Sequence, residues 1–181
     1  MSASFTKLDR GRTALVVVDL QEGFRTAVEG FDEIARQAAI LVQGARVLGL
    51  PVVVTEQYPR GLGDTVPEVA EHLGGAARHP KTVFAASQAE GFDLEGRDQA
   101  LLCGIETHVC VNQTALDLLG RGVDVHVAAD AVGSRTAANR DVGLHKMERA
   151  GATLTSVETA LFELLERAGT DEFKTIQGLV K

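Results

Sequence analysis

The stretch Ala14-Leu-Val-Val-Val-Asp19 decides the fold class of this chain. An unbroken apolar run rich in β-branched valine, closed by a carboxylate, predicts a strand that is buried on both faces. Comparable runs recur along the sequence and predict strands at residues 13–19, 52–56, 82–85, 100–103, 123–129 and 153–155, of which 82–85 is the weakest. Amphipathic segments separate these runs. The alternation predicts one α/β domain over residues 1–181, a three-layer α/β/α sandwich around a mainly parallel sheet.

The segments between the predicted strands carry helical signals. Apolar side chains recur three and four apart between residues 34 and 48, and Gly49 ends that pattern. Further helices are predicted at residues 107–120, 137–150 and 156–168 and after residue 171. Thr155 and Glu158 have the spacing of a capping box at the start of the third of these. The stretch 57–75, rich in proline and glycine, is the longest irregular connection, and such loops at strand ends often carry function.

Composition disfavours several classes of protein. The chain has 18 Lys and Arg against 25 Asp and Glu, and a net charge of −7 gives no footprint for nucleic acid or anionic lipid. The apolar runs fall well short of the about 20 residues that span a bilayer, and the start of the chain has no signal-peptide pattern. Two cysteines cannot build a disulfide framework. We expect a cytoplasmic protein with a small-molecule substrate and no nucleic-acid or membrane partner.

The two cysteines have different surroundings. Cys103 lies within an apolar run, where a free cysteine behaves as a small buried hydrophobe. Cys110 follows a predicted strand-to-helix turn, and with Thr107 as the N-cap it occupies the third helical position, near the positive end of the helix dipole. A helix terminus contributes only about 0.3 to 2 kcal/mol. A nucleophilic Cys110 therefore needs a nearby base or ammonium group as well.

Two candidate partners for Cys110 stand near other strand ends. Asp19 ends the first predicted strand, where a buried carboxylate needs a partner, although it could instead cap the following loop. Lys81 precedes the predicted strand 82–85, although a single lysine is usually an exposed one. Ligands of open α/β folds bind at the carboxyl ends of the strands. The spacing thus suggests a group of Asp19, Lys81 and Cys110, and leaves a structural role open for each.

Several longer motifs run the length of the chain. They are Ala14-Leu-Val-Val-Val-Asp-Leu-Gln-Glu-Gly-Phe24, Lys81-Thr-Val-Phe84, Cys103-Gly-Ile-Glu-Thr-His-Val-Cys110-Val and Asp130-Ala-Val-Gly-Ser-Arg135. In order and spacing these segments resemble the isochorismatase-like cysteine hydrolases. The stretch from Thr55 to Pro67 and the tail Phe173-Lys-Thr-Ile-Gln resemble the isochorismatase domain-containing subgroup. The resemblance implies that family's Rossmann-like fold and, because relatives are commonly oligomeric, a homo-oligomer.

The resemblance also implies a catalytic triad. In it Cys110 is the nucleophile, Asp19 takes its proton, and Lys81 holds Asp19 ionised and favours the thiolate. It further implies a cis peptide between Ile105 and Glu106, which aims the backbone N–H groups of Glu106 and Cys110 at a developing oxyanion. The predicted pocket walls, each of which could equally be core or surface, are Phe24, Tyr58, Phe84 and His108.

Two departures from the family narrow the expected activity. Metal-dependent nicotinamidases carry an Asp and two His after the second strand, where this chain reads Thr55-Glu-Gln-Tyr58, so we expect no metal and no cofactor. True isochorismatases generally lack the cysteine that stands here as Cys110. The expected function is metal-independent hydrolysis of a C–N, amide-like bond in a small molecule through a Cys110 thioester. The alternatives are an isochorismatase-type vinyl-ether hydrolase and a non-catalytic interaction protein that retains the fold.

Overall fold

The strands assemble into a single sheet. The computed structural model describes residues 7–181, and residues 1–6 of the predicted domain lie outside the described residues. All strand pairs in the described part are parallel, in the order β3-β2-β1-β4-β5-β6. The strands are β1 (Thr13–Val18), β2 (Val52–Gln57), β3 (Arg78–Lys81), β4 (Gln99–Ile105), β5 (Asp124–Gly133) and β6 (Thr153–Thr155). The predicted α/β fold class, with a parallel Rossmann-like sheet, is confirmed.

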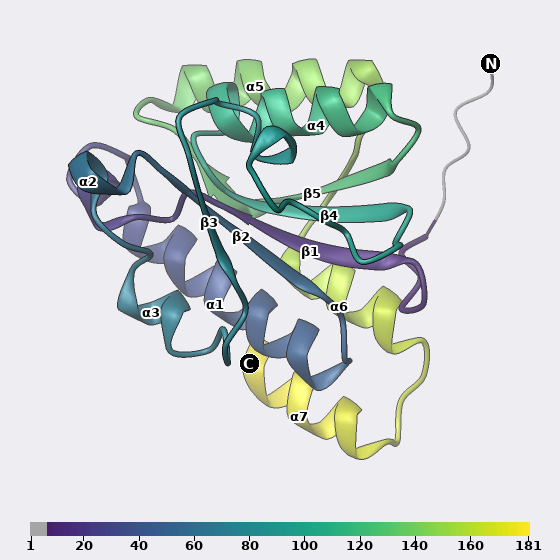
Figure 1. Cartoon of the computed structure of the whole chain (residues 1–181). Coiled ribbons are helices and arrows are strands. Elements are labelled where there is room, and N and C mark those ends of the chain that lie inside the picture. The colour runs from purple at the N-terminus through teal and green to yellow at the C-terminus, as the bar shows by residue number, and fades with distance from the viewer. Residues whose placement is uncertain (1–6) are drawn as a thin grey trace.

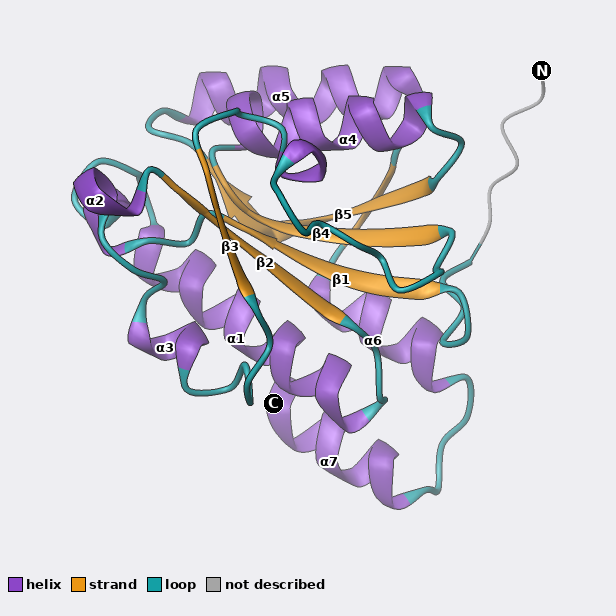
Figure 2. Cartoon of the chain, in the orientation of Figure 1, coloured by secondary structure: helices purple, strands orange, loops and turns teal. Residues whose placement is uncertain are grey.

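Helices cover both faces of this sheet, as the layers in Figures 1 and 2 show. One face carries α1 (Phe31–Val47), α3 (Pro67–Ala70), α6 (Val157–Leu165) and α7 (Asp171–Val180), and the other carries α4 (Asn112–Gly120) and α5 (Ala137–Ala150). The short α2 (Pro59–Leu62) follows the carboxyl end of β2. None of the helices within residues 7–181 has the length and apolarity to cross a membrane.

The core explains why the run at residues 14–18 is apolar without a break. Leu15 and Val17 pack into the cluster on the α1 side of the sheet, while Val16 and Val18 pack into the cluster on the α4 side. Every residue of β1 is buried. A central strand between two helical layers has no solvent face, so it needs no polar alternation.

The predicted strand at residues 82–85 is wrong, because the strand in this region is β3, which ends at Lys81. Its sequence, Arg-His-Pro-Lys, has no apolar run. As the edge strand of the sheet it pairs with β2 alone, and an edge tolerates Pro80, which has no N–H to donate. The apolar residues that suggested a strand lie in the following loop, where Val83 is 41% and Phe84 51% exposed.

Two predicted helix starts also differ from the structure. The capping box of Thr155 and Glu158 is wrong: Ser156 is the N-cap of α6, and its hydroxyl accepts the N–H of Thr159 at 3.1 Å. The helix predicted from Thr107 begins instead as a π-helical turn over Thr107–Val111 that leads into α4. Thr107 is not the cap, since its hydroxyl is buried without a hydrogen-bond partner in the described part of the chain. The helix predicted at residues 137–150 is confirmed.

Candidate active site

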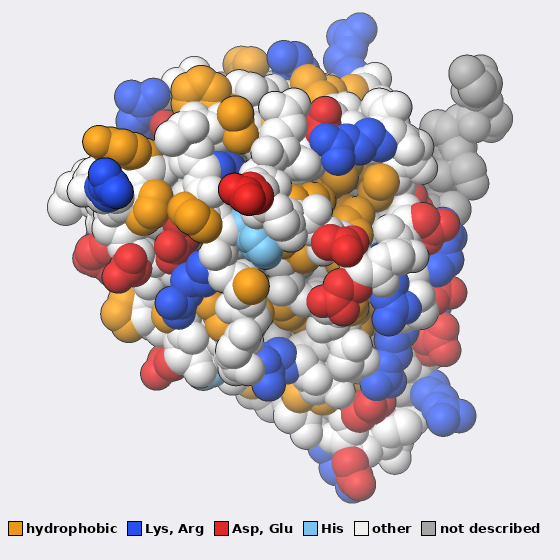
Figure 3. Space-filling model, viewed as in Figure 1, with side chains coloured by type: hydrophobic (Ala, Val, Ile, Leu, Met, Phe, Trp, Pro, Cys, Tyr) orange, Lys and Arg blue, Asp and Glu red, His pale blue; other side chains and the backbone are white. Residues whose placement is uncertain are grey.

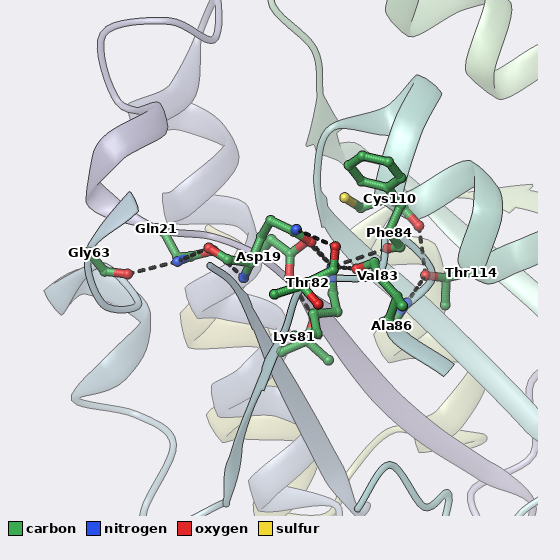
Figure 4. A network of polar contacts seen from close by, with 12 residues as sticks. Asp19, Gln21, Gly63, Lys81, Thr82, Val83, Phe84, Ala86, Cys110 and Thr114 are labelled. Atoms are coloured by element: carbon green, nitrogen blue, oxygen red, sulfur yellow. Dashed lines mark hydrogen bonds and ion pairs between the residues drawn. The ribbon is translucent and has the colours of Figure 1, made fainter. Parts of the chain in front are cut away.

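The ends of three strands bring the three predicted catalytic residues together. Asp19 follows β1, Lys81 is the last residue of β3, and Cys110 lies in the π-helical turn that follows β4. The strand order reverses between β1 and β4, and open α/β sheets form their binding crevices at such a point. Figure 4 shows the resulting network of polar contacts, with Cys110 beside it.

Asp19 is held from two sides and has no contact with solvent. Its Oδ2 accepts a hydrogen bond from Lys81 Nζ at 2.7 Å, and its Oδ1 accepts one from Thr55 Oγ1 at 2.7 Å. The side chains of the Asp19–Lys81 ion pair are both 0% exposed. The backbone of Asp19 lies in the left-handed region with φ of 52°, which Asp tolerates better than most residues. The carboxylate is therefore fixed where the chain leaves β1.

The ammonium group of Lys81 is surrounded by acceptors. Besides Asp19 it donates to Gln57 Oε1 at 2.6 Å and lies 3.2 and 3.1 Å from the backbone carbonyls of Val83 and Phe84. The loop after β3 thus wraps around the side chain that ends the strand. These contacts stabilise a buried positive charge next to Asp19, so Lys81 can hold that carboxylate ionised.

Burial dominates the proton affinities of the site. The pKa of Cys110 rises to about 12, first because the thiol is buried and then because Asp19 lies close, while Lys81 acts in the opposite direction. Burial also raises the pKa of Asp19, against the opposing effects of Lys81 and of its hydrogen bonds. The lowering of the Cys110 pKa that was expected from the helix terminus is outweighed by burial. The resting nucleophile is a neutral thiol next to a carboxylate whose basicity is increased.

Neighbouring residues fix the position of Cys110. Thr114 donates its hydroxyl hydrogen to the backbone carbonyl of Cys110 at 2.6 Å and accepts the N–H of Ala86 at 2.8 Å, so it ties the nucleophile turn to the loop after β3. On the other side, α5 packs closely through Gly143: a Cβ there would lie 2.8 Å from the carbonyl oxygen of Thr107. The backbone of Cys110 is therefore held by the Thr114 hydroxyl and by the close packing of α5 against the turn.

Cys103 has the buried location that its sequence predicts. It lies in β4 with 0% exposure and packs in the α1-side cluster, and burial raises its pKa to about 12. Cys110, by contrast, opens onto a cavity. Access, and not resting acidity, distinguishes the two thiols.

The cavity in front of Cys110 has a volume of about 500 Å³. Its walls are mostly apolar and are formed by Gly23, Phe24, Ala27, Gln57, Leu62, Phe84, Glu106, Val109, Cys110 and Arg135. Two of the predicted pocket walls, Phe24 and Phe84, are among them. Tyr58 lines a neighbouring hollow instead, and His108 makes a 3.0 Å contact from Nδ1 to Ser134 Oγ. Hydrophobic side chains gather at the α2 end of the surface, visible in Figure 3.

The predicted oxyanion donors belong to the same wall. The peptide bond between Ile105 and Glu106 is cis, as the resemblance implied, and Glu106 and Cys110 both line the cavity. The Glu106 carboxylate is nearly buried and pairs with Arg135, whose Nε lies 3.0 Å from Oε1. The carboxylate of Glu106 is therefore paired with Arg135, whereas that of Asp19 is paired with Lys81.

Sequence reasoning missed three residues of the site: Thr55, Gln57 and Arg135. Thr55 and Gln57 hold Asp19 and Lys81 from β2, and the signal for them was the polar end of the apolar run 52–54. Arg135 ends a motif to which no role was given. Within residues 7–181 no group of three or more His, Cys, Asp or Glu is arranged to hold a metal ion.

Comparisons with known proteins identify the family and agree with the fold. A family model described as Isochorismatase domain matches residues 13–159. The chain is 43% identical to isochorismatase domain-containing protein 1 of Danio rerio over 90% of this chain and 59% of that protein. It is 42% identical to isochorismatase domain-containing protein 2A of Mus musculus over 99% of this chain and 87% of that protein. The chain thus spans less than two thirds of the first of these relatives.

Two solved structures extend the comparison. A structure described as MAR1 ribonuclease from Caenorhabditis elegans has a TM-score of 0.91 and 39% identity, covering 97% of this chain and 92% of that one. The YcaC gene product of Escherichia coli, described as an octameric hydrolase of unknown specificity, has a TM-score of 0.87 and 26% identity, covering 97% of this chain and 91% of that one. The shared architecture extends over nearly the whole chain.

Proposed function

The chain belongs to the isochorismatase family, and from this premise we propose that it is a cysteine hydrolase that cleaves a C–N bond of a small amide-like molecule. Membership of the family supports a hydrolase. The thioester intermediate and the amide-like substrate are our proposal, and one observation supports it: the Lys81–Asp19 pair, closed at 2.7 Å and fully buried, lies next to a thiol that opens onto a cavity.

In the proposed reaction the Cys110 sulfur attacks the carbonyl carbon of the substrate. As the C–S bond forms, the thiol proton passes to Asp19, whose raised pKa makes it a stronger base than an ordinary carboxylate. The carbonyl oxygen becomes an oxyanion and accepts hydrogen bonds from the backbone N–H groups of Glu106 and Cys110. When the C–N bond breaks, Asp19 returns the proton to the leaving nitrogen and an acyl thioester remains.

Water completes the proposed cycle. It attacks the thioester carbon and gives a proton to Asp19, the C–S bond breaks, and the sulfur recovers its proton from Asp19. Lys81 transfers no proton in this scheme. Its ammonium, held by Gln57 and two backbone carbonyls, keeps a positive charge beside the carboxylate in each step.

The cavity favours a small substrate. A volume of about 500 Å³ with mostly apolar walls is typical of a small-molecule site. The C. elegans structure is described as a ribonuclease. For this chain we propose no nucleic-acid partner, because the net charge is −7 and a polyanion needs a basic surface. We also propose a single-domain, cytoplasmic homo-oligomer, an assembly supported by the octameric E. coli neighbour and testable by light scattering.

A substrate panel tests the proposed function. Primary amides, N-substituted amides, ureas, a vinyl ether and a single-stranded RNA are offered to the wild type, to Cys110→Ala and to the matched control Cys103→Ala. We expect hydrolysis of at least one C–N compound, an acyl-enzyme mass on Cys110, and loss of both in Cys110→Ala alone. Vinyl-ether cleavage that survives Cys110→Ala, RNA cleavage, or a panel without turnover or acylation would each overturn the proposal; the first points to the vinyl-ether alternative and the last to the interaction protein.

A further inference from the structure

Two segments carry the reacting groups of the proposed mechanism, and they come from different parts of the chain. The nucleophile Cys110 lies in the π-helical turn that leads into α4. The loop after β3 encloses the ammonium group of Lys81, because the carbonyls of Val83 and Phe84 lie 3.2 and 3.1 Å from its Nζ. The proposed proton transfer therefore needs this loop and this turn to keep a fixed spacing.

The hydroxyl of Thr114 joins the loop to the turn. It donates to the carbonyl of Cys110 at 2.6 Å and accepts the backbone N–H of Ala86 at 2.8 Å, and Figure 4 shows both hydrogen bonds. A threonine in a helix often bonds to the carbonyl four residues earlier, but here the same hydroxyl also holds a loop 28 positions away. Thr114 has no exposed surface and does not line the cavity, so it acts on the reaction only through what it holds.

A second contact attaches the same loop to α4 without touching the nucleophile turn. Ser87 donates its hydroxyl hydrogen to Oδ2 of Asp117 at 2.5 Å, and Arg121 donates to the backbone carbonyl of Ser87 at 3.3 Å. The loop is thus held to the helix at two places, and of these two the contact through Thr114 is the one that includes the nucleophile.

We infer that Thr114 is a positioning residue of the proposed reaction: its hydroxyl sets the Cys110 thiol against the Lys81–Asp19 pair, and the rate of sulfur attack depends on it. This inference rests on the proposed function of the same site. A general base must lie within hydrogen-bond reach of the proton that it takes. A misplacement of about 1 Å in such a geometry lowers a rate about 10²-fold. Without the hydroxyl, the loop around Lys81 and the turn with the thiol lose their direct link.

Two reagents with different geometric needs test this inference without a known substrate. With p-nitrophenyl acetate the Cys110 sulfur bonds to the acetyl carbon, p-nitrophenolate leaves, and the thiol proton passes to Asp19. With iodoacetamide the sulfur bonds to the methylene carbon, iodide leaves and the thiol proton is lost, but no oxyanion forms. The measured quantity is the ratio of the acylation rate to the alkylation rate at Cys110, followed by mass spectrometry at pH 7. This ratio corrects for changes in access to the thiol.

Matched variants separate positioning from stability. Thr114→Val keeps the shape and removes the hydroxyl, Thr114→Ser keeps the hydroxyl, and Ser87→Ala removes the loop contact that does not include Cys110. We expect Thr114→Val to lower the ratio at least about tenfold, because acylation needs the oxyanion geometry and alkylation does not. Thr114→Ser and Ser87→Ala should keep the wild-type ratio, although loss of a buried hydrogen bond also lowers the Tm of Ser87→Ala.

A further variant breaks the same link from the side of the loop. Ala86→Pro removes the N–H that Thr114 accepts. Position 86 opens a 3-10 helix, and Ala85 before it has an extended backbone with φ of −67° and ψ of 121°, which a following proline permits. The ratio should decrease as it does in Thr114→Val, and Ala86→Pro carries the test if Thr114→Val does not fold.

The outcomes separate this inference from the proposed function. If Thr114→Val and Ser87→Ala lose Tm alike and both keep the wild-type ratio, Thr114 is merely structural and the inference fails, even where a C–N compound is hydrolysed through Cys110. A ratio in Thr114→Ser as low as in Thr114→Val would also overturn it. A ratio that depends on the hydroxyl, together with a substrate panel without turnover, would confirm the positioning role and overturn the hydrolase. Absence of acetylation on Cys110 of the wild type would overturn both.

Discussion

Replacing Asp19 by Asn disturbs both the stability and the chemistry of the site, and the geometry separates the two effects. Oδ1 and Oδ2 each accept a 2.7 Å hydrogen bond, one from Thr55 and one from Lys81. An amide has one oxygen, so its NH₂ group must face either a hydroxyl or an ammonium. The ammonium of Lys81, with no exposed surface, also loses its counter-ion.

The expected magnitudes follow from these contacts. Removing one partner of a buried ion pair costs about 3 to 5 kcal/mol. The lower end applies here, because Gln57 and two carbonyls still hold Lys81. For a chain of this size each kcal/mol lowers Tm by about 2 to 4 °C, so a loss of about 3 kcal/mol should make Asp19→Asn unfold roughly 6 to 12 °C earlier. Loss of the general base should lower kcat about 10² to 10⁴-fold.

A double variant distinguishes a catalytic Asp19 from a structural one. In Asp19→Asn/Lys81→Met both charges are gone, so no buried charge is left without a counter-ion, and such an unpaired charge is the main cost of removing one partner alone. We expect urea unfolding to show recovery of at least half of the lost stability, while kcat per folded molecule stays at the level of the single variant. If Asp19→Asn keeps more than a tenth of wild-type kcat, or if activity recovers with stability, Asp19 is not the base.

Four further outcomes are expected. Iodoacetamide should modify Cys110 before Cys103, because Cys110 opens onto the cavity. The rate of Cys110 labelling should still increase above pH 9, because the pKa of this thiol is about 12. A rate that reaches a plateau below pH 9, or labelling of Cys103 before Cys110, would contradict the proposed site. The burial of Cys103 raises its folded pKa to about 12, against about 8.5 unfolded, so its contribution to stability is complete below pH 8.5 and disappears as the pH rises through 12. The free energy of unfolding, measured with urea, should therefore decrease less with rising alkaline pH in Cys103→Ala than in the wild type. An equal decrease in the two proteins would contradict this. Gly143→Ala should lower the free energy of unfolding by about 1 to 3 kcal/mol and displace the nucleophile turn, because its Cβ would lie 2.8 Å from Thr107 O. In the control Gly178→Ala the new Cβ meets no atom within 4 Å, so the free energy of unfolding in urea should stay the same or increase. Activity found in the panel should survive treatment with EDTA and phenanthroline, and its loss with stoichiometric metal release would refute a metal-free mechanism.

The parts of the fold that sequence predicted are those with one dominant physical signal. The run 14–18 is buried on both faces and reads as a strand without its surroundings. The α5 helix has a Thr136 cap at one end and Gly151 at the other. β3 lacked such a signal, because an exposed edge strand selects only weakly for apolar residues. At α6, Thr155 and Ser156 are both capping residues, and local spacing alone could not choose between them.

The site was predictable only as far as single residues could be assigned to strand ends. Asp19 closes an apolar run, Cys110 follows a predicted strand-to-helix turn, and Lys81 stands next to a predicted strand. The resemblance supplied their roles as a triad. The contact between Glu106 and Arg135 joins residues 29 positions apart and depends on how two loops meet above β4 and β5. Likewise, the raised pKa of Cys110 comes from its burial and from Asp19, which lies far away in the sequence. The spacing of residues within the sequence motifs predicts neither the Glu106–Arg135 contact nor the raised pKa of Cys110.

Burial raises the pKa of both partners of the proposed proton transfer, and the two increases have opposite consequences for that transfer. It makes the thiolate scarce, since the pKa of Cys110 is about 12, and it makes Asp19 a stronger proton acceptor. A thiol in this state reacts slowly with reagents that make no use of the cavity, because the free thiolate is nearly absent at neutral pH. A substrate that places its carbonyl oxygen against the donors of Glu106 and Cys110 changes this balance, since charge then moves onto the oxyanion as the proton moves to Asp19. The proposed selectivity of the enzyme therefore arises in the transition state, where a correctly held electrophile makes proton transfer favourable, and not in a permanently activated cysteine.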